Sequence, residues 1–225
     1  MTLRIGGFSV LIALALGACA TAPAPSPYDA SVAASAIKTP DFAKTLMPIP
    51  KDAKTVRMAH IQPYPELDPK RFIWVSLPED LRAHCRGKAD PTLAMQQSLG
   101  LPPDNSAPYK VFLFDVPTER LFRPCMSGGD VTTTSCALEM GQSVDPSESV
   151  PAKEKRLAVE QFVLSQILYS YQSGGKHPGY PFTGMGWSYD WNPANATHQG
   201  VSEYVLMPGE LTGKPVIQKP EEFCS

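Results

Sequence analysis

YKVFLFDV, residues 109–116, is the stretch on which the fold prediction depends. Its aromatic and branched side chains are typical of a β-strand, because they pack well on a pleated surface. The next three residues, PTE, would reverse the chain, so that RLFRP (120–124) returns beside the strand and ends at Cys125. This stretch therefore predicts the clearest strand of the chain and a β-hairpin that ends at Cys125.

Further strands are predicted on both sides of this hairpin. Residues 54–60 (KTVRMAH) and 71–77 (RFIWVSL) have the same branched and aromatic composition. In residues 185–191 large apolar side chains alternate with Gly, Ser and Asp, a period of two that indicates a half-buried strand. NPANATHQ (192–199) would then form a turn, and GVSEYVLM (200–207) would pair with the preceding strand.

Helices are predicted between the strands. Asp90 followed by Pro91 is a good helix start, with Gly100 as its end, and a shorter helix would begin at Pro78 and carry Cys85. A long helix is predicted over 151–173, with its core-facing stripe formed by Leu157, Leu164, Leu168 and Tyr171, and with Val163 and Ile167 beside them. These elements predict an α+β fold, a single domain in which an antiparallel sheet has helices packed on one face. An all-β sandwich with one inserted helix is the alternative.

The first residues have the pattern of an export signal. Arg4 precedes an apolar run over 5–16, and no acidic residue occurs before Asp29. This run is shorter than the about 20 residues that a membrane-spanning helix needs, so it indicates a secretory signal peptide.

The end of that run, Leu16-Gly17-Ala18-Cys19, resembles the lipobox of bacterial lipoproteins. The resemblance implies acylation of the Cys19 thiol, cleavage before Cys19 and acylation of the new amino terminus. Several acyl chains would give a stable membrane anchor, whereas a single chain would bind only marginally. Because Ala20 rather than aspartate follows Cys19, the resemblance also implies sorting to the outer membrane. An ordinary cleaved signal peptide, in which Cys19 has no role, is the alternative.

The remaining chain divides into a tether and one folded region. Residues 19–40 contain the lipidated cysteine and a segment rich in Ala, Pro and Ser, which we expect to be a flexible tether. Residues 41–225 are long enough for a single globular domain with a sizeable core. The formal net charge is −2, and neither a basic stripe nor a run of like charges indicates nucleic acid as a partner.

Four cysteines lie in the predicted domain, and an exported protein would pair them as two disulfides. Cys125 and Cys136 bound a Gly- and Ser/Thr-rich loop that a local bridge would close, which leaves Cys85 to bond Cys224 and staple the C-terminal tail. Three pairings are possible in principle, and this one is favoured. A thiolate metal site is disfavoured because the sequence contains no Cys-x-x-Cys.

Two groups of residues near the C-terminus are candidates for ligand binding. Trp187, Tyr189 and Trp191 would form an aromatic platform for a sugar ring, although alternate aromatic residues on a strand more often face the core. If the two C-terminal strands pair, Asp190 and Glu203 would lie close together, with His177 and His198 nearby. Such a set would serve acid–base chemistry, or it would be a group of solvated side chains on a polar face.

No sequence motif predicts a catalytic residue, a cofactor or a metal site, since neither GxSxG nor HExxH occurs. We therefore expect a non-catalytic outer-membrane lipoprotein that binds another component of the cell envelope, a protein or a glycan, or that is an accessory subunit of an envelope assembly. Its domain would face the periplasm or the cell surface. The alternative function is an envelope-located hydrolase or glycan-binding protein that uses residues 177–203. A small-molecule or metal carrier is the third possibility, and no spacing of candidate ligands in the sequence supports it.

Overall fold

The computed structural model describes residues 24–126, 129–138, 147–171 and 179–225. The signal peptide, Cys19 and His177 lie outside these residues. In the described part the strands are β1 (Thr55–Gln62), β2 (Ile73–Val75), β3 (Lys110–Pro117), β4 (Leu121–Phe122), β5 (Trp187–Tyr189), β6 (Gln199–Ser202), β7 (Tyr204–Leu206) and β8 (Thr212–Gln218). The helices are α1 (Pro27–Ala36), α2 (Pro78–Cys85), α3 (Pro91–Ser98), α4 (Val150–Ser170) and α5 (Pro220–Phe223), with short 3-10 turns at Pro40–Phe42 and Thr118–Arg120.

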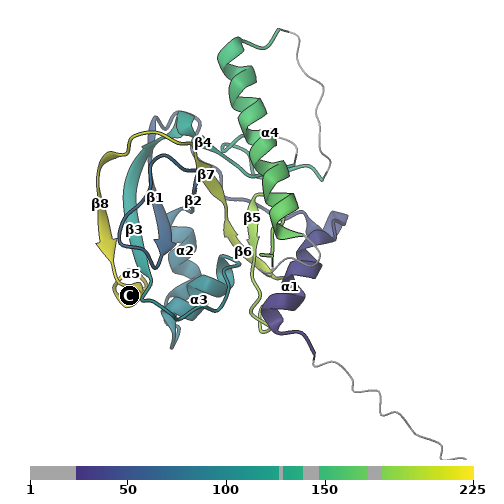
Figure 1. The fold of residues 1–225 in the computed structure, drawn as a ribbon, viewed down its shortest axis with the longest axis vertical. Coiled ribbons are helices and arrows are strands. Elements are labelled where there is room, and N and C mark those ends of the chain that lie inside the picture. Colours follow the sequence, from purple (N-terminus) through teal and green to yellow (C-terminus); the bar gives the residue numbers. More distant parts are fainter. Residues whose placement is uncertain (1–23, 127–128, 139–146, 172–178) are drawn as a thin grey trace, which may run out of the picture.

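The predicted α+β class is confirmed, and so are the antiparallel pairing and the long helix (Figure 1). The strands form three small antiparallel sheets, in the orders β1-β3-β8, β2-β7-β4 and β5-β6. The predicted strand at 109–116 is the central strand β3, paired with β1 on one side and β8 on the other.

Both faces of β3 are covered, which explains its nearly unbroken run of apolar residues. Phe112 and Phe114 pack on one face with Ile73 and Tyr204, which belong to the β2-β7-β4 sheet. Val111 and Leu113 pack on the other face, where they meet side chains from the helices α2, α3 and α5: Leu81, Cys85, Met95 and Phe223. Helices therefore cover one face of the β1-β3-β8 sheet, and the second sheet covers the other.

The far face of the second sheet packs against α4. Phe162 of α4 lies 5.4 Å from the ring of Trp74 in β2 and 5.4 Å from the ring of Phe122 in β4. Val159 and Val163 are buried beside it. These ring contacts determine which face of α4 is turned toward the sheet.

The predicted core-facing stripe of α4 is therefore wrong in part. Leu157, Leu164 and Leu168 have exposed fractions of 41%, 45% and 65%. Only Tyr171 and the flanking Val163 and Ile167 contact the core. Helical spacing alone would allow either face, and the aromatic contacts of Phe162 decide between them.

The predicted hairpin from β3 to β4 is also wrong. After a 3-10 turn, the chain leaves the β1-β3-β8 sheet, and β4 pairs with β7 in the second sheet. Leu121 packs in the core between the two sheets, and Phe122 packs on the opposite side, against α4. Both side chains are buried as a result.

Part of the expected tether is a helix. Ser26 caps α1 by accepting a hydrogen bond from the backbone N–H of Asp29. Tyr28 is buried with its ring 6.0 Å from that of Trp191, and its hydroxyl donates to the carbonyl of Gly179. Residues 27–36 therefore pack on the folded region, because one aromatic anchor in an otherwise Ala-rich segment finds a buried position.

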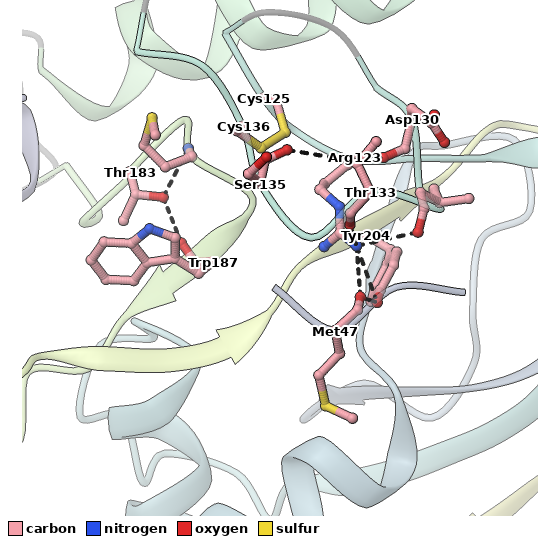
Figure 2. Close-up of a disulfide and its surroundings, with 12 residues drawn as sticks. Met47, Arg123, Cys125, Asp130, Thr133, Ser135, Cys136, Thr183, Trp187 and Tyr204 are labelled. Carbon is pink, nitrogen blue, oxygen red and sulfur yellow. Dashed lines mark hydrogen bonds between the residues drawn. A yellow bond between two sulfur atoms is a disulfide. The ribbon is translucent and has the colours of Figure 1, made fainter. Parts of the chain in front are cut away.

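Both expected disulfides are present, Cys85–Cys224 and Cys125–Cys136. The first joins α2 to the residue that follows α5, so it fixes the end of the chain against the helical layer. The second lies next to Arg123 (Figure 2).

Arg123, directly after β4, is fully buried and links segments that are distant in the sequence. Its Nη2 atom donates to the carbonyl oxygens of Met47, Val131 and Thr133, at 2.6, 3.3 and 3.2 Å. Figure 2 shows Arg123 with Met47 and Thr133. The guanidinium also lies 4.6 Å from the centre of the Tyr204 ring.

Gly186 makes room for this arginine. A Cβ atom there would lie 2.7 Å from Cδ of Arg123 and 2.9 Å from Sγ of Cys136, and the residue has φ of +73°. Any other residue would clash with the buried side chain and would strain the backbone.

Replacing Arg123 with Met should lower the free energy of unfolding by about 3 kcal/mol, because three carbonyl oxygens lose a charged donor. Chemical denaturation without reductant measures the change. Arg86→Met, at an exposed position after α2, is the matched control and should change stability by less than about 0.5 kcal/mol. Equal stability of the two variants would contradict the role given to Arg123.

Candidate functional site

A cavity of about 580 Å³ lies where β1 and β2 meet α4 and the end of α3. This volume falls within the range of roughly 300–1,000 Å³ that is usual for small-molecule sites. Its lining is mainly apolar and comes from seven parts of the chain: Ala59, His60, Ile61, Arg71, Trp74, Val75, Ser76, Leu81, Leu99, Gly100, Leu101, Ser165, Gln166, Tyr169, Tyr180, Pro181 and Glu203.

Local structure at the end of α3 shapes one wall. Asp90 caps this helix through the backbone N–H of Leu93, as the sequence predicted, and the helix ends before Gly100. Gly100 has φ of +64°, and a Cβ atom there would lie 3.1 Å from Cγ of Pro181. Glycine therefore allows the helix to stop and the segment at Pro181 to pack closely against it.

Three aromatic side chains form a second wall, Trp74 from β2, Tyr169 from α4 and Tyr180. The rings of Tyr169 and Tyr180 lie 5.7 Å apart, and the Tyr180 hydroxyl donates to Oε1 of Gln166. Burial raises the pKa of Tyr180 above its ordinary value, so this hydroxyl stays protonated at physiological pH. The wall is thus held in place by ring packing and by one hydrogen bond to α4.

Among the described residues, Glu203 is the only acidic one that lines the cavity. It lies between β6 and β7, where its backbone N–H donates to the carbonyl of Gly186. The Ser188 hydroxyl donates to its Oε1 atom at 2.9 Å. The other oxygen, Oε2, is buried and has no hydrogen-bond partner in the described part of the chain, although the residue as a whole is only partly buried.

The environment of Glu203 favours the neutral acid. Burial raises the pKa of the Glu203 carboxyl to about 8, against the opposing effects of the Ser188 hydrogen bond and the positive charge of Arg123. A carboxyl group with a strongly raised pKa in a cavity is typical of a functional site.

His60, from β1, lines the same cavity. Its Nδ1 lies 2.7 Å from the carbonyl oxygen of Trp74 and its Nε2 lies 3.0 Å from Oε1 of Gln62. Burial lowers the pKa of His60 below its ordinary value, although both hydrogen bonds act in the opposite direction. Because both ring nitrogens have partners within the protein, the imidazole is fixed as part of the wall.

Of the acidic and histidine residues predicted near 177–203, only Glu203 lines this cavity within the described ranges. The Asp190 carboxylate accepts from the backbone N–H of Asn192 and from the side-chain amide of Asn195, both at 2.8 Å. His198 Nδ1 lies 2.9 Å from the backbone oxygen of Asp190. These hydrogen bonds hold the turn between β5 and β6 together, and they do not involve Glu203.

The three predicted platform residues are buried with exposed fractions of 1% for Trp187 and 7% for Tyr189 and Trp191. The ring of Trp187 packs 5.0 Å from that of Phe42, and the indole N–H of Trp191 donates to the carbonyl of Leu101. None of the three lines the cavity. The alternation in this strand does not mark a solvent face, since Gly186, Ser188 and Asp190 are buried as well.

Comparisons with known proteins identify no relative. No family model matches the chain, and neither a curated protein nor a solved structure matches it. Within the described ranges, no cluster of three or more His, Cys, Asp and Glu side chains could hold a metal ion. In that same part of the chain, every helix is too short or too polar to cross a membrane.

Glu203→Gln should remove a pH dependence of stability. Because the pKa of Glu203 is about 8 in the folded protein and about 4.3 in an unfolded chain, the folded state retains a proton that the unfolded state releases. Stability should therefore fall as pH rises from about 4.3 to 8, by at most about 1.4 kcal/mol per pH unit. In Glu203→Gln this contribution should be absent.

Urea denaturation at several pH values measures this dependence. Glu221→Gln, at an exposed position on α5, is the matched control and should keep the wild-type profile. An unchanged profile in Glu203→Gln would show that Glu203 is ionised at neutral pH in the folded protein.

Proposed function

We propose that this chain is a non-catalytic binding protein of the bacterial cell envelope and that it takes a small ligand with an apolar body into the cavity beside Glu203. One observation carries the proposal: a cavity of about 580 Å³ with a mainly aliphatic and aromatic lining and the carboxyl group of Glu203. A mostly apolar pocket with few polar groups is the usual form of a small-molecule site.

The polar groups of the cavity favour binding over catalysis. The ring nitrogens of His60 lie against the Trp74 carbonyl and Oε1 of Gln62, so no nucleophile is paired with His60 among the described residues. The Ser165 hydroxyl donates to the carbonyl of Phe162 in its own helix. These contacts do not form a nucleophile paired with a base.

The location is part of the proposal. The Leu16-Gly17-Ala18-Cys19 pattern supports a lipid anchor at Cys19, with sorting to the outer membrane and the domain facing the periplasm or the cell surface. The two disulfides agree with an oxidising compartment. Anchoring would keep the cavity close to the membrane and raise the effective concentration of ligands there.

A second candidate function is that of an accessory subunit in an envelope assembly, with another envelope protein as partner. The observation that favours it is the exposed apolar face of α4, formed by Val150, Leu157, Leu164 and Leu168. This helix stands at the edge of the molecule (Figure 1). Replacing Leu164 and Leu168 with Glu should then abolish crosslinking to a stoichiometric partner in cells, and unchanged crosslinking would contradict this function.

A variant that fills the cavity tests the first function. Ser165→Trp places an indole at a cavity-lining position of α4 whose own side chain is exposed, so the fold should tolerate it. Binding of the neutral fluorescent probe N-phenylnaphthylamine to the full chain should weaken at least about tenfold, the equivalent of 1.4 kcal/mol.

The matched control is Ala152→Trp, an exposed position on the same helix that does not line the cavity, and it should bind like the wild type. Equal binding by both variants would place the probe elsewhere and would contradict the proposal. So would a wild-type chain that does not bind the probe.

A further inference from the structure

We infer that the preferred ligand of this cavity is an organic cation, an amine attached to an apolar body, whose charged nitrogen pairs with Glu203. The inference rests on the proposed function and adds the chemical class of the ligand. It follows from the charges, the hydrogen-bonding groups and the aromatic rings of the cavity.

The charges leave Glu203 without a counter-ion. Among the described residues, no ion pair includes Glu203. Arg123 is near enough to lower its pKa, but no hydrogen bond joins the two side chains in the described part of the chain: Nη2 donates to three backbone carbonyls, and Nε and Nη1 have no partner there. Arg71 also lines the cavity, but it is exposed to solvent, which screens its charge. A cationic ligand would supply the missing positive charge in a largely apolar enclosure, where an ion pair is stronger than in water.

The hydrogen-bonding groups call for a donor. Oε1 of Glu203 already accepts from Ser188, and Oε2 has no donor among the described residues. The Tyr180 hydroxyl is committed to Gln166 and the ring nitrogens of His60 to Trp74 and Gln62. An ammonium group carries only donors, so it fits a carboxylate that lacks them.

The aromatic wall favours the same ligand. The faces of Trp and Tyr rings are electron-rich and attract cations, and Trp74, Tyr169 and Tyr180 line the cavity together with Glu203. A carboxylate ligand would gain no ion pair, because Glu203 would have to stay protonated beside it. The aliphatic residues Ile61, Leu81, Leu99 and Leu101 would contact the apolar body.

Binding of such a cation should release a proton. The side chains that influence the Glu203 carboxyl are Ser188 and Arg123. Burial, with a smaller contribution from Glu203, raises the pKa of Tyr171 and of Tyr180, so both phenols stay neutral. His60, the other titratable group of the lining, has a lowered pKa and stays neutral above pH 7. Because Glu203 itself has a pKa of about 8 without ligand, a cation binds more tightly as pH rises toward 8, when less work is needed to ionise the carboxyl.

Calorimetric titration with three probes of one shape tests the inference: phenethylamine, phenethyl alcohol and hydrocinnamate. The full chain is held in lipid nanodiscs, and nanodiscs without protein correct for partitioning into lipid. At pH 8 the amine should bind at least about tenfold more tightly than the alcohol, as expected for a charge-assisted hydrogen bond. Hydrocinnamate should bind most weakly. Between pH 8 and pH 6 the amine should lose about tenfold or more in affinity, while the alcohol should not change.

Glu203→Gln keeps the shape of the side chain and should abolish both the preference for the amine and its pH dependence. Glu221→Gln should keep both. If the Glu203→Gln variant fails to fold, the comparison of the three probes on the wild-type chain still decides the question.

The outcomes separate the two proposals. Equal binding of amine and alcohol would contradict the inference that the ligand is a cation, but not the proposal that the cavity binds small ligands. Tighter binding of hydrocinnamate would have the same meaning. A preference for the amine that survives in Glu203→Gln would also overturn the inference. If none of the probes binds, the proposed binding function fails as well.

Discussion

The buried guanidinium of Arg123 is the interaction on which the arrangement around the cavity depends. It donates to backbone carbonyls at Met47, Val131 and Thr133, so one side chain holds the segment before β1 and the loop after β4 in place. The Tyr204 hydroxyl donates to the same Met47 carbonyl, which adds β7 to this set. A buried charge is unfavourable unless its donors are used, and the carbonyl oxygens partly meet that requirement. Nε and Nη1 have no partners among the described residues.

This arrangement also determines the position of Glu203. Gly186 packs against the aliphatic part of Arg123 and accepts a hydrogen bond from the backbone N–H of Glu203. At this point the chain leaves β6 and enters β7, which belongs to a different sheet. Glu203 lies at that change of sheet, beside Ser188, and lines the cavity. The same residues that satisfy the buried arginine therefore place a carboxyl group in an apolar environment.

Local sequence features predicted much of the fold. The strand at 109–116, the Asp90 cap and the helix that carries Cys85 all depend on neighbouring residues, and the structure contains them. The face of α4 depends instead on Phe162 meeting rings from β2 and β4, which no spacing within the helix reveals. The path of β4 likewise depends on a partner about 85 residues further along the chain.

The site was predictable only in part for the same reason. The sequence indicates Glu203 as a candidate, but Asp190 and His198, its expected partners within the described residues, hold the β5–β6 turn instead. His60 and Trp74 lie on the consecutive strands β1 and β2, whereas Tyr180 comes from a distant part of the sequence and meets them only after folding. The aromatic residues at 187–191 are close together in the sequence, yet they pack in the core and do not line the cavity. The closely spaced aromatic residues of the sequence are thus core residues. The aromatic residues that line the cavity are farther apart in the sequence.

A crystal structure of the full chain purified from the cells that produce it, without added ligand, would test the central claim most directly. The account predicts density for a retained molecule between Trp74, Tyr180 and Glu203, with an apolar body against the aliphatic wall and a polar end at the carboxyl group. A cavity closed by the side chains around it, or one that contains only water, would contradict the claim that this is the functional site.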